Sequence, residues 1–263
     1  MNEKSLAREV IGEIFGTFIL IVLGDGVVAN VGLAPRALFG GWYWVTVGWA
    51  FAVIIAVYVS NGASGAHLNP AVTIAMAIKR GFPAKKILPY IIAQVVGAFL
   101  GALVVYLCYR DGLVAAGLPN VWTSGPGSVF GQTYWNGGAH EALGGYSLIT
   151  ACITEVVGTM MLLCGILASG DSKNTGLMHN LSPMLVGGTV LAVGLSLGGP
   201  SGYAINPARD FGPRLFGLIV GTQGLFDGFY WLAAPIISTI VGGILGVLFY
   251  DWFITPAFKK AAQ

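Results

Sequence analysis

Hydrophobic residues along the chain fall into long runs that short polar segments separate. Such runs lie near residues 9–30, 40–62, 87–109, 145–168, 183–198 and 229–254. A helix needs about 20 mostly apolar residues to cross the roughly 30 Å hydrocarbon core of a bilayer. The pattern therefore predicts an all-α membrane protein with six transmembrane helices.

Two shorter apolar segments, 69–78 and 206–219, remain between these runs. They are too short to cross a bilayer and are typical of re-entrant segments. Each begins at an Asn-Pro pair. Asn caps free N–H groups at a helix start, and Pro at the first helical position needs no hydrogen-bond donor. We therefore expect two re-entrant half-helices.

Composition supports a membrane protein, because 56% of the 263 residues are hydrophobic and only 9% are charged. Soluble domains carry about 25% charged residues. The net charge of +2 is too small to indicate a nucleic-acid partner. No HExxH, GxSxG or Walker sequence is present, and the three Cys lack metal-site spacing. We expect membrane lipid as a partner and no enzyme, cofactor or metal site.

Basic residues beside the six spans are distributed unevenly between the two sides of the membrane. Nine lie on one side, namely Lys4, Arg8, Lys79, Arg80, Lys85, Lys86, Lys173, Lys259 and Lys260, and four on the other, namely Arg36, Arg110, Arg209 and Arg214. The positive-inside rule then places both termini in the cytoplasm of a multi-pass cell-membrane protein. The few charges and short tails suggest a bacterial source.

The two halves of the chain repeat each other. GEIFGTFILIVLG at 12–24 resembles TEVVGTMMLLCGI at 154–166, and SGAHLNPAVT at 64–73 resembles SGYAINPARD at 201–210. With three spans per copy, the second copy enters the membrane from the opposite side, and inverted repeats of this kind place a solute site near the midplane. We predict one domain, 1–263, with inverted repeats at approximately 1–110 and 145–254. The Gly-rich segment 111–144 is expected to be an ordered extracellular loop that covers the channel mouth.

A third repeated feature is a GxxxG pair in a long apolar run of each half. Gly97 and Gly101 form one pair, and Gly242 and Gly246 form the other. Small residues at this spacing allow close helix contact in membranes, so we expect a packing role for them.

The half-helices predict a polar centre inside the membrane. If their N-termini meet, their partial positive charges converge, and the amides of Asn69 and Asn206 face the path. Non-helical backbone at this depth is tolerated where it lines a cavity or is buried in protein. The preceding loops, with Gly65, Ala66 and His67 in one and Gly202 and Ala204 in the other, are therefore expected to line a pore.

Six spans in two inverted halves, with Asn69-Pro70-Ala71 and Asn206-Pro207-Ala208 as paired NPA motifs, resemble the aquaporin superfamily (major intrinsic proteins) over essentially the whole chain. The stretch SGYAINPARDFGPR, with Asp210 after Arg209, is similar to the glycerol-facilitator (aquaglyceroporin) branch. The resemblance implies the aquaporin fold and a homotetramer with one pore per subunit. It also implies passive passage of glycerol, water and other small uncharged solutes, such as polyols, urea or undissociated hydroxy acids. Ions and protons are expected to be excluded.

The same resemblance assigns a selectivity filter by position. Arg209 follows the second NPA motif, Trp49 lies 20 residues before Asn69, and Gly194 lies 12 residues before Asn206. Gly194 stands where water-selective members usually have His, which implies a wider constriction. Tyr203 departs from the Phe that is typical of glycerol channels, and its phenol oxygen adds a polar group that affects the ranking of solutes.

Three polar residues in or beside the spans allow two interpretations each. The resemblance implies that Glu13 and Glu155 accept hydrogen bonds from the loop backbone, and snorkelling to the cytoplasmic face is the alternative. His67 lines the cytoplasmic half of the path or braces the loop.

An ion-coupled secondary transporter is the main alternative function, since inverted repeats and broken helices occur there as well. Ion coupling requires acidic residues near the membrane midplane, and only Glu13, Glu155 and Asp210 could serve. Each of the three can also be interpreted as a structural residue. The sequence therefore favours a passive channel.

Overall fold

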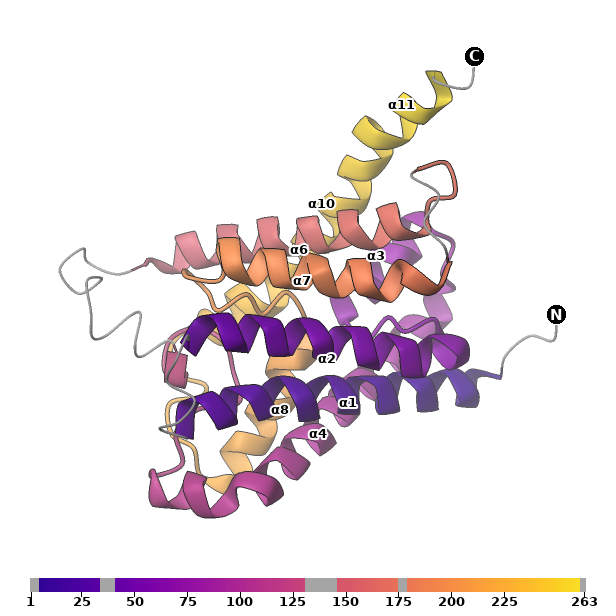
Figure 1. Cartoon of the computed structure of the whole chain (residues 1–263). Coiled ribbons are helices and arrows are strands. Elements are labelled where there is room, and N and C mark those ends of the chain that lie inside the picture. The colour runs from indigo at the N-terminus through magenta and orange to yellow at the C-terminus, as the bar shows by residue number, and fades with distance from the viewer. Residues whose placement is uncertain (1–4, 34–40, 131–145, 175–178, 261–263) are drawn as a thin grey trace.

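The computed structural model describes residues 5–33, 41–130, 146–174 and 179–260. Helices dominate this part of the chain (Figure 1). Their bounds are α1 Leu6–Leu33, α2 Gly41–Ser64, α3 Pro70–Lys79, η2 Ala84–Lys86, α4 Ile87–Ala115, α6 Leu148–Gly170, η3 His179–Leu181, α7 Ser182–Leu197, α8 Pro207–Val220, α9 Tyr230–Leu232, η4 Ala233–Ser238, α10 Thr239–Phe249, η5 Tyr250–Ile254 and α11 Thr255–Lys260.

Five of the helical stretches are long and apolar enough to cross a membrane: Leu6–Leu33, Gly41–Ser64, Ala84–Ala115, Leu148–Gly170 and Tyr230–Ala257. The sixth predicted span, 183–198, corresponds to α7, which has 16 residues. At about 1.5 Å per residue it is shorter than the hydrocarbon core. It nevertheless runs beside α2 and α6 in the bundle, as a crossing helix would (Figure 1).

The two halves of the chain have matching contacts. In the first, α1 packs against α2 and α4; in the second, α6 packs against α7 and α10. Helices α2 and α7 join the halves. Each half-helix also packs on the third span of the other half, α3 on α10 and α8 on α4, so the halves interlock.

The two half-helices begin near the middle of the molecule and extend toward opposite ends (Figure 1). Both start at the Pro of an Asn-Pro pair, as the sequence predicts, with Asn69 and Asn206 as N-caps. The segments before them are non-helical. This arrangement brings both helix N-termini to the centre of the bundle.

The GxxxG pairs lie at close contacts between helices. A Cβ on Gly97 would stand 2.3 Å from the backbone oxygen of Ile14, and one on Gly242 would stand 2.3 Å from that of Val156. Any larger residue would force α4 away from α1, or α10 away from α6. The predicted packing role of these glycines is confirmed.

The last span is not the single regular helix that the run 229–254 predicts. It begins with three α-helical residues, continues as π-helix over Ala233–Ser238, and turns π-helical again over Tyr250–Ile254. Pro235 lies in the first π segment, and Pro has no N–H to give to an α-helical hydrogen bond. Helical structure then continues to Lys260.

The predicted loop 111–144 begins later than expected, because α4 continues to Ala115. The residues after α4 are ordered and largely buried: Asn120, Trp122 and Ser124 are each at most 6% exposed. Residues 131–145 lie outside the described part of the chain.

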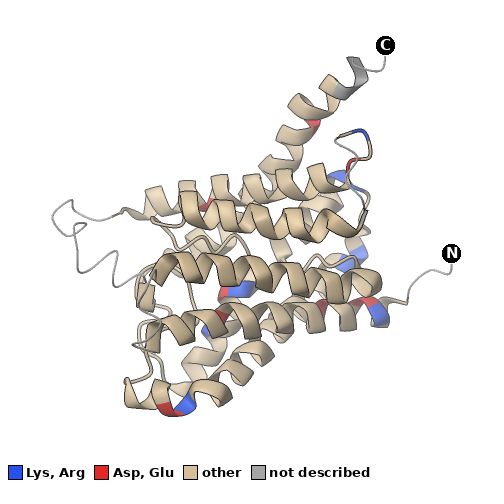
Figure 2. Cartoon of the chain, in the orientation of Figure 1, with Lys and Arg blue, Asp and Glu red and all other residues tan. Residues whose placement is uncertain are grey.

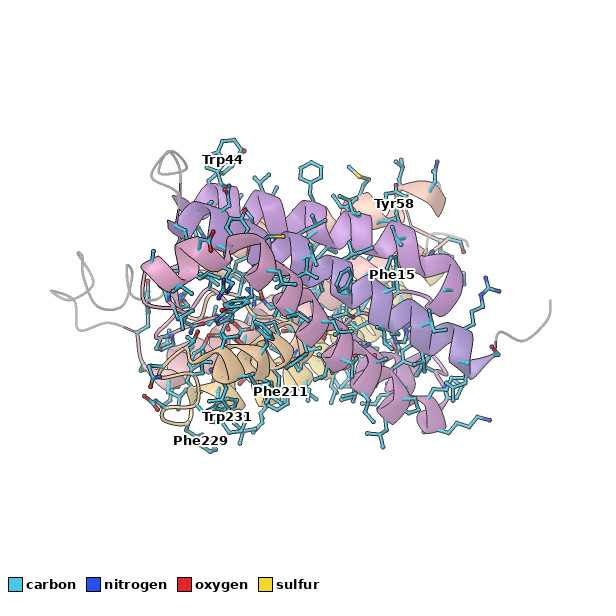
Figure 3. The ribbon with its side chains drawn as sticks, turned by 90° about the horizontal axis from the view of Figure 1, so that it is seen from below. Phe15, Trp44, Tyr58, Phe211, Phe229 and Trp231 are labelled. Atoms are coloured by element: carbon cyan, nitrogen blue, oxygen red, sulfur yellow. The ribbon has the colours of Figure 1, made fainter. Side chains whose placement is uncertain are left out.

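The outer surface is apolar, with ring side chains such as Phe15, Trp44, Tyr58 and Phe229 each about half exposed (Figure 3). Charged residues gather near the ends of the helices, with a few inside the bundle (Figure 2). Two of those inside are Arg209 and Arg214, at 7% and 4% exposure. Both side chains are therefore part of the interior and not of the outer surface. A surface of this kind suits a lipid environment.

Candidate functional site

Two cavities meet inside the bundle. The larger has a volume of about 740 Å³ and the other about 400 Å³. Trp49, Tyr203 and Arg209 line both of them. The three side chains that the sequence assigns to a filter therefore stand together at the junction of the two cavities.

The N-termini of the half-helices are joined through their Asn side chains. Asn69 Nδ2 donates to Ile205 O at 2.8 Å, and Asn206 Nδ2 donates to Leu68 O at 2.8 Å. Meanwhile Asn69 Oδ1 caps its own helix through Ala71 N, and Asn206 Oδ1 does so through Ala208 N. Each Nδ2 carries a second hydrogen, and both Asn residues line the larger cavity.

The loops before the half-helices have an unusual backbone that repeats in both halves. Four residues other than Gly have φ between +40° and +51°, namely Ala66, Leu68, Tyr203 and Ile205. The φ angles of Gly65 and Gly202 are +88° and +76°. For residues other than Gly, this left-handed conformation costs roughly 1–2 kcal/mol each. Gly65, Ala66, His67 and Ala204 line the larger cavity, and Gly202 lines the smaller one.

Glu13 supports the first loop from α1. Its Oε1 accepts from His67 N at 2.9 Å, and its Oε2 accepts from Leu68 N at 2.7 Å. Ser64 Oγ and Gln94 Nε2 complete its shell at 2.6 and 2.7 Å. Since the carboxylate is 0% exposed, it does not snorkel.

Glu155 supports the second loop in the same way from α6. Its two oxygens accept from Ala204 N at 2.7 Å and Ile205 N at 2.8 Å. These bonds offset the strain of the left-handed residues, because hydrogen bonds to charged groups contribute about 1.5–3 kcal/mol each. The two acids thus occupy equivalent places under the two loops.

His67 fits both of its sequence interpretations. It lines the larger cavity, and its Nδ1 lies 3.1 Å from Thr73 Oγ1. The rings of Phe82 and Tyr90 pack on it with centroids at 4.7 and 5.2 Å. The side chain is therefore a braced part of the cavity wall.

Arg209 is held from several directions. Its guanidinium carbon lies 4.0 Å from the centroid of Trp49, and its Nη1 donates to Trp122 O at 3.4 Å. The backbone N–H of Arg209 donates to Asn206 Oδ1 at 3.2 Å, so the filter and the NPA motif are directly connected.

Tyr203 and Gly194 share one space. A Cβ on Gly194 would stand 2.8 Å from both Tyr203 Cζ and Thr46 Cγ2. The Tyr203 ring thus takes the room that a side chain at position 194 would need. Its hydroxyl and Trp49 Nε1 are buried and have no hydrogen-bond partner among the described residues.

Sequence reasoning missed Asp25 and the contacts of Asp210. Asp25 Oδ1 lies 3.5 Å from Arg209 Nη1. Asp210 accepts from Ser124 N and from Arg214 Nε at 2.9 and 2.8 Å, which ties the segment after α4 to α8. An acid next to a long apolar run was the one available signal for Asp25, and nothing in the sequence indicated its partner.

The fold and the site define a polytopic membrane channel with two half-helices that meet at its centre. The family model described as Major intrinsic protein matches residues 1–250. The chain belongs to the major intrinsic protein family, so the predicted membership of the aquaporin superfamily is confirmed.

Known relatives cover nearly the whole chain. A protein of Thermotoga maritima named "Probable glycerol uptake facilitator protein" is 46% identical over 92% of this chain and 97% of its own length. "Glycerol uptake facilitator protein 3" of Lactiplantibacillus plantarum is 41% identical over 95% of this chain and 99% of its own length. The X-ray structure of the aquaglyceroporin from Plasmodium falciparum matches with a TM-score of 0.85 and 35% identity, covering 97% of this chain and 100% of that one.

Proposed function

We propose that this protein is a passive channel whose chief solute is glycerol, with water and other small uncharged molecules also admitted. The observation that carries the proposal is the junction of the two cavities at Trp49, Tyr203 and Arg209. The glycerol-facilitator names of close relatives support the same choice of solute.

At the junction, the solute meets two kinds of surface. Trp49 and Tyr203 offer an apolar wall to a carbon chain, while Arg209 and the loop carbonyls offer partners to hydroxyl groups. Those partners matter, because a hydroxyl that leaves water without a new hydrogen bond costs roughly 2–7 kcal/mol. A small polyol satisfies both surfaces at once, whereas a larger or unsubstituted chain does not.

Ions are excluded at two places along this path. A cation meets the guanidinium of Arg209 and then the converging N-termini of α3 and α8, whose partial charges are positive. This explanation is the one established for aquaporin-type channels, and the residues here fit it. The Asn69 and Asn206 amides give a passing solute hydrogen bonds in place of bulk water.

The three acids that the sequence offers to an ion-coupled transporter are engaged in structural contacts. Glu13 and Glu155 hold loop backbone, and Asp210 holds Ser124 and Arg214. Their contacts support a passive channel over coupled transport.

The proposed orientation, assembly and membrane of the channel are those that the sequence predicts. Both termini face the cytoplasm, and the larger cavity opens there, since its lining includes Arg80 and Lys173. The repeats 1–110 and 145–254 are joined by an extracellular loop. Four copies assemble in the lipid of a cell membrane, each with its own pore, and the first two relatives named above point to a bacterial source.

Glycerol uptake into proteoliposomes tests this function. Labelled glycerol should enter until its inside and outside concentrations are equal, at a rate that Na⁺ and pH gradients leave unchanged. Uptake no faster than in protein-free liposomes would refute the glycerol channel, and accumulation above the outside concentration would favour the transporter.

A further inference from the structure

A buried carboxylate stands behind the filter, and no role described above uses it. Asp25 in α1 is 0% exposed, and neither of its oxygens accepts a hydrogen bond from a described residue. It is absent from the lining of both cavities, so it does not touch the path. A charge inside a membrane protein requires a partner, and Arg209 Nη1 at 3.5 Å provides one.

The repeat shows that these two positions belong together. Alignment of Glu13 with Glu155 places Leu167 where the first half has Asp25, and alignment of the two NPA motifs places Val72 where the second half has Arg209. Val72 and Leu167 belong to one buried apolar cluster. Both pairs therefore join the two halves: Asp25 and Arg209 form a charged pair, and the repeat-equivalent Leu167 and Val72 form an apolar pair.

The other contacts of Arg209 do not balance its charge. Trp49 offers a ring face, and Trp122 offers a carbonyl at 3.4 Å, and both groups are neutral. The residue before Asp25 also serves the filter, because a Cβ on Gly24 would stand 2.3 Å from Trp49 Cζ3. Two consecutive residues of α1 thus lie directly behind two filter side chains.

We propose that Asp25 is a positioning residue that holds the Arg209 side chain against the wall of the path and so sets the preference for glycerol over water. The proposal rests on the glycerol function proposed above. Without the carboxylate, the guanidinium is left unbalanced in a desolvated place and moves toward the water in the cavities. The junction then narrows, which obstructs a three-carbon polyol more than a water molecule.

The variant Asp25→Asn tests this role, since it keeps the shape of the side chain and removes its charge. Thr17→Val is the matched control, because Thr17 lies on the same helix, is 0% exposed and has no partner among the described residues. Glycerol and water permeabilities are measured in proteoliposomes with equal amounts of folded protein. We expect the glycerol-to-water ratio to fall several-fold in Asp25→Asn and to stay unchanged in Thr17→Val. A merely structural role would lower both permeabilities together, and an unchanged ratio overturns the proposal.

A double-mutant cycle tests the pairing without relying on glycerol. Asp25→Leu and Arg209→Val each leave one buried charge alone, whereas the double variant reproduces the apolar pair found at the repeat-equivalent positions Leu167 and Val72. We expect the double variant to lose less thermal stability in detergent than Asp25→Leu alone. Additive losses would overturn the pairing. If liposomes that contain the wild-type protein take up no glycerol, the proposed function is refuted instead. The double-mutant cycle would still decide whether Asp25 and Arg209 are partners.

Discussion

Asn69 and Asn206 each donate a hydrogen bond to the carbonyl of the residue that precedes the other, at 2.8 Å in both directions. Each of these Asn residues also caps its own half-helix. The pair therefore fixes two helix N-termini, from opposite halves of the chain, at one point of the path. This reciprocity explains why the NPA motif occurs twice at equivalent places.

Asn206→Asp should weaken the exclusion of cations. The variant keeps the oxygen that caps α8, but it removes the donor to Leu68 O and adds a negative charge where the helix dipoles are positive. We expect a faster proton leak, measured with a pH-sensitive dye inside liposomes. Asn61→Asp, which changes another Asn in the lining of the same cavity, should leave the leak at the wild-type level. Equal leaks in the two variants would count against a barrier at the half-helices.

Tyr203→Phe should raise the ratio of glycerol to water permeability. The hydroxyl has no partner among the described residues, so its removal breaks no hydrogen bond and leaves the ring that lines both cavities without a polar atom. The ratio is measured by stopped-flow light scattering. The control is Tyr106→Phe, because that ring packs on Phe216 and lines neither cavity. If the ratio does not change, Tyr203 is not a determinant of selectivity.

Gly194→Ala should lower glycerol permeability more than water permeability. The added methyl group would stand 2.8 Å from Tyr203 Cζ, so the ring has to shift toward the junction. Gly188→Ala lies on the same helix with nothing within 4 Å of the added Cβ, and it should conduct as the wild type does. A wild-type glycerol rate in Gly194→Ala would show that the Tyr203 ring has room to move elsewhere.

Glu155→Gln should destabilise the second loop. The variant replaces a charged acceptor of Ala204 N and Ile205 N by a neutral amide with one oxygen. A loss of about 1.5–3 kcal/mol in the free energy of unfolding is expected, since hydrogen bonds to charged groups contribute about that much. Thermal unfolding in detergent measures the change. Thr159→Val, on the same helix and equally buried, should differ from the wild type by far less, and similar losses in both would contradict a supporting role for Glu155.

The elements of the fold were largely predictable, because hydropathy and Asn-Pro pairs report local properties. The half-helices expected at 69–78 and 206–219 are found at Pro70–Lys79 and Pro207–Val220. The end of α4 and the two π segments of the last span, of which the first contains Pro235, were not foreseen. Their boundaries depend on tertiary packing and on one missing N–H, which a hydropathy average does not register.

The partners of the buried polar residues were not predictable from the sequence. Gln94 meets Glu13 from 81 positions away, and Ser124 meets Asp210 from 86 positions away. Asp25 lies at the end of an apolar run, and an acid at such a position is usually interpreted as exposed to solvent. The pairs become visible only when the two halves interlock and bring distant segments together.

The most direct test of the channel is the recovery of liposome volume in a glycerol gradient, followed by stopped-flow light scattering. Liposomes that contain the protein should shrink and then reswell faster than protein-free liposomes, at a rate that rises in proportion to the amount of protein. Reswelling at the protein-free rate, with the protein folded and inserted, would contradict the account.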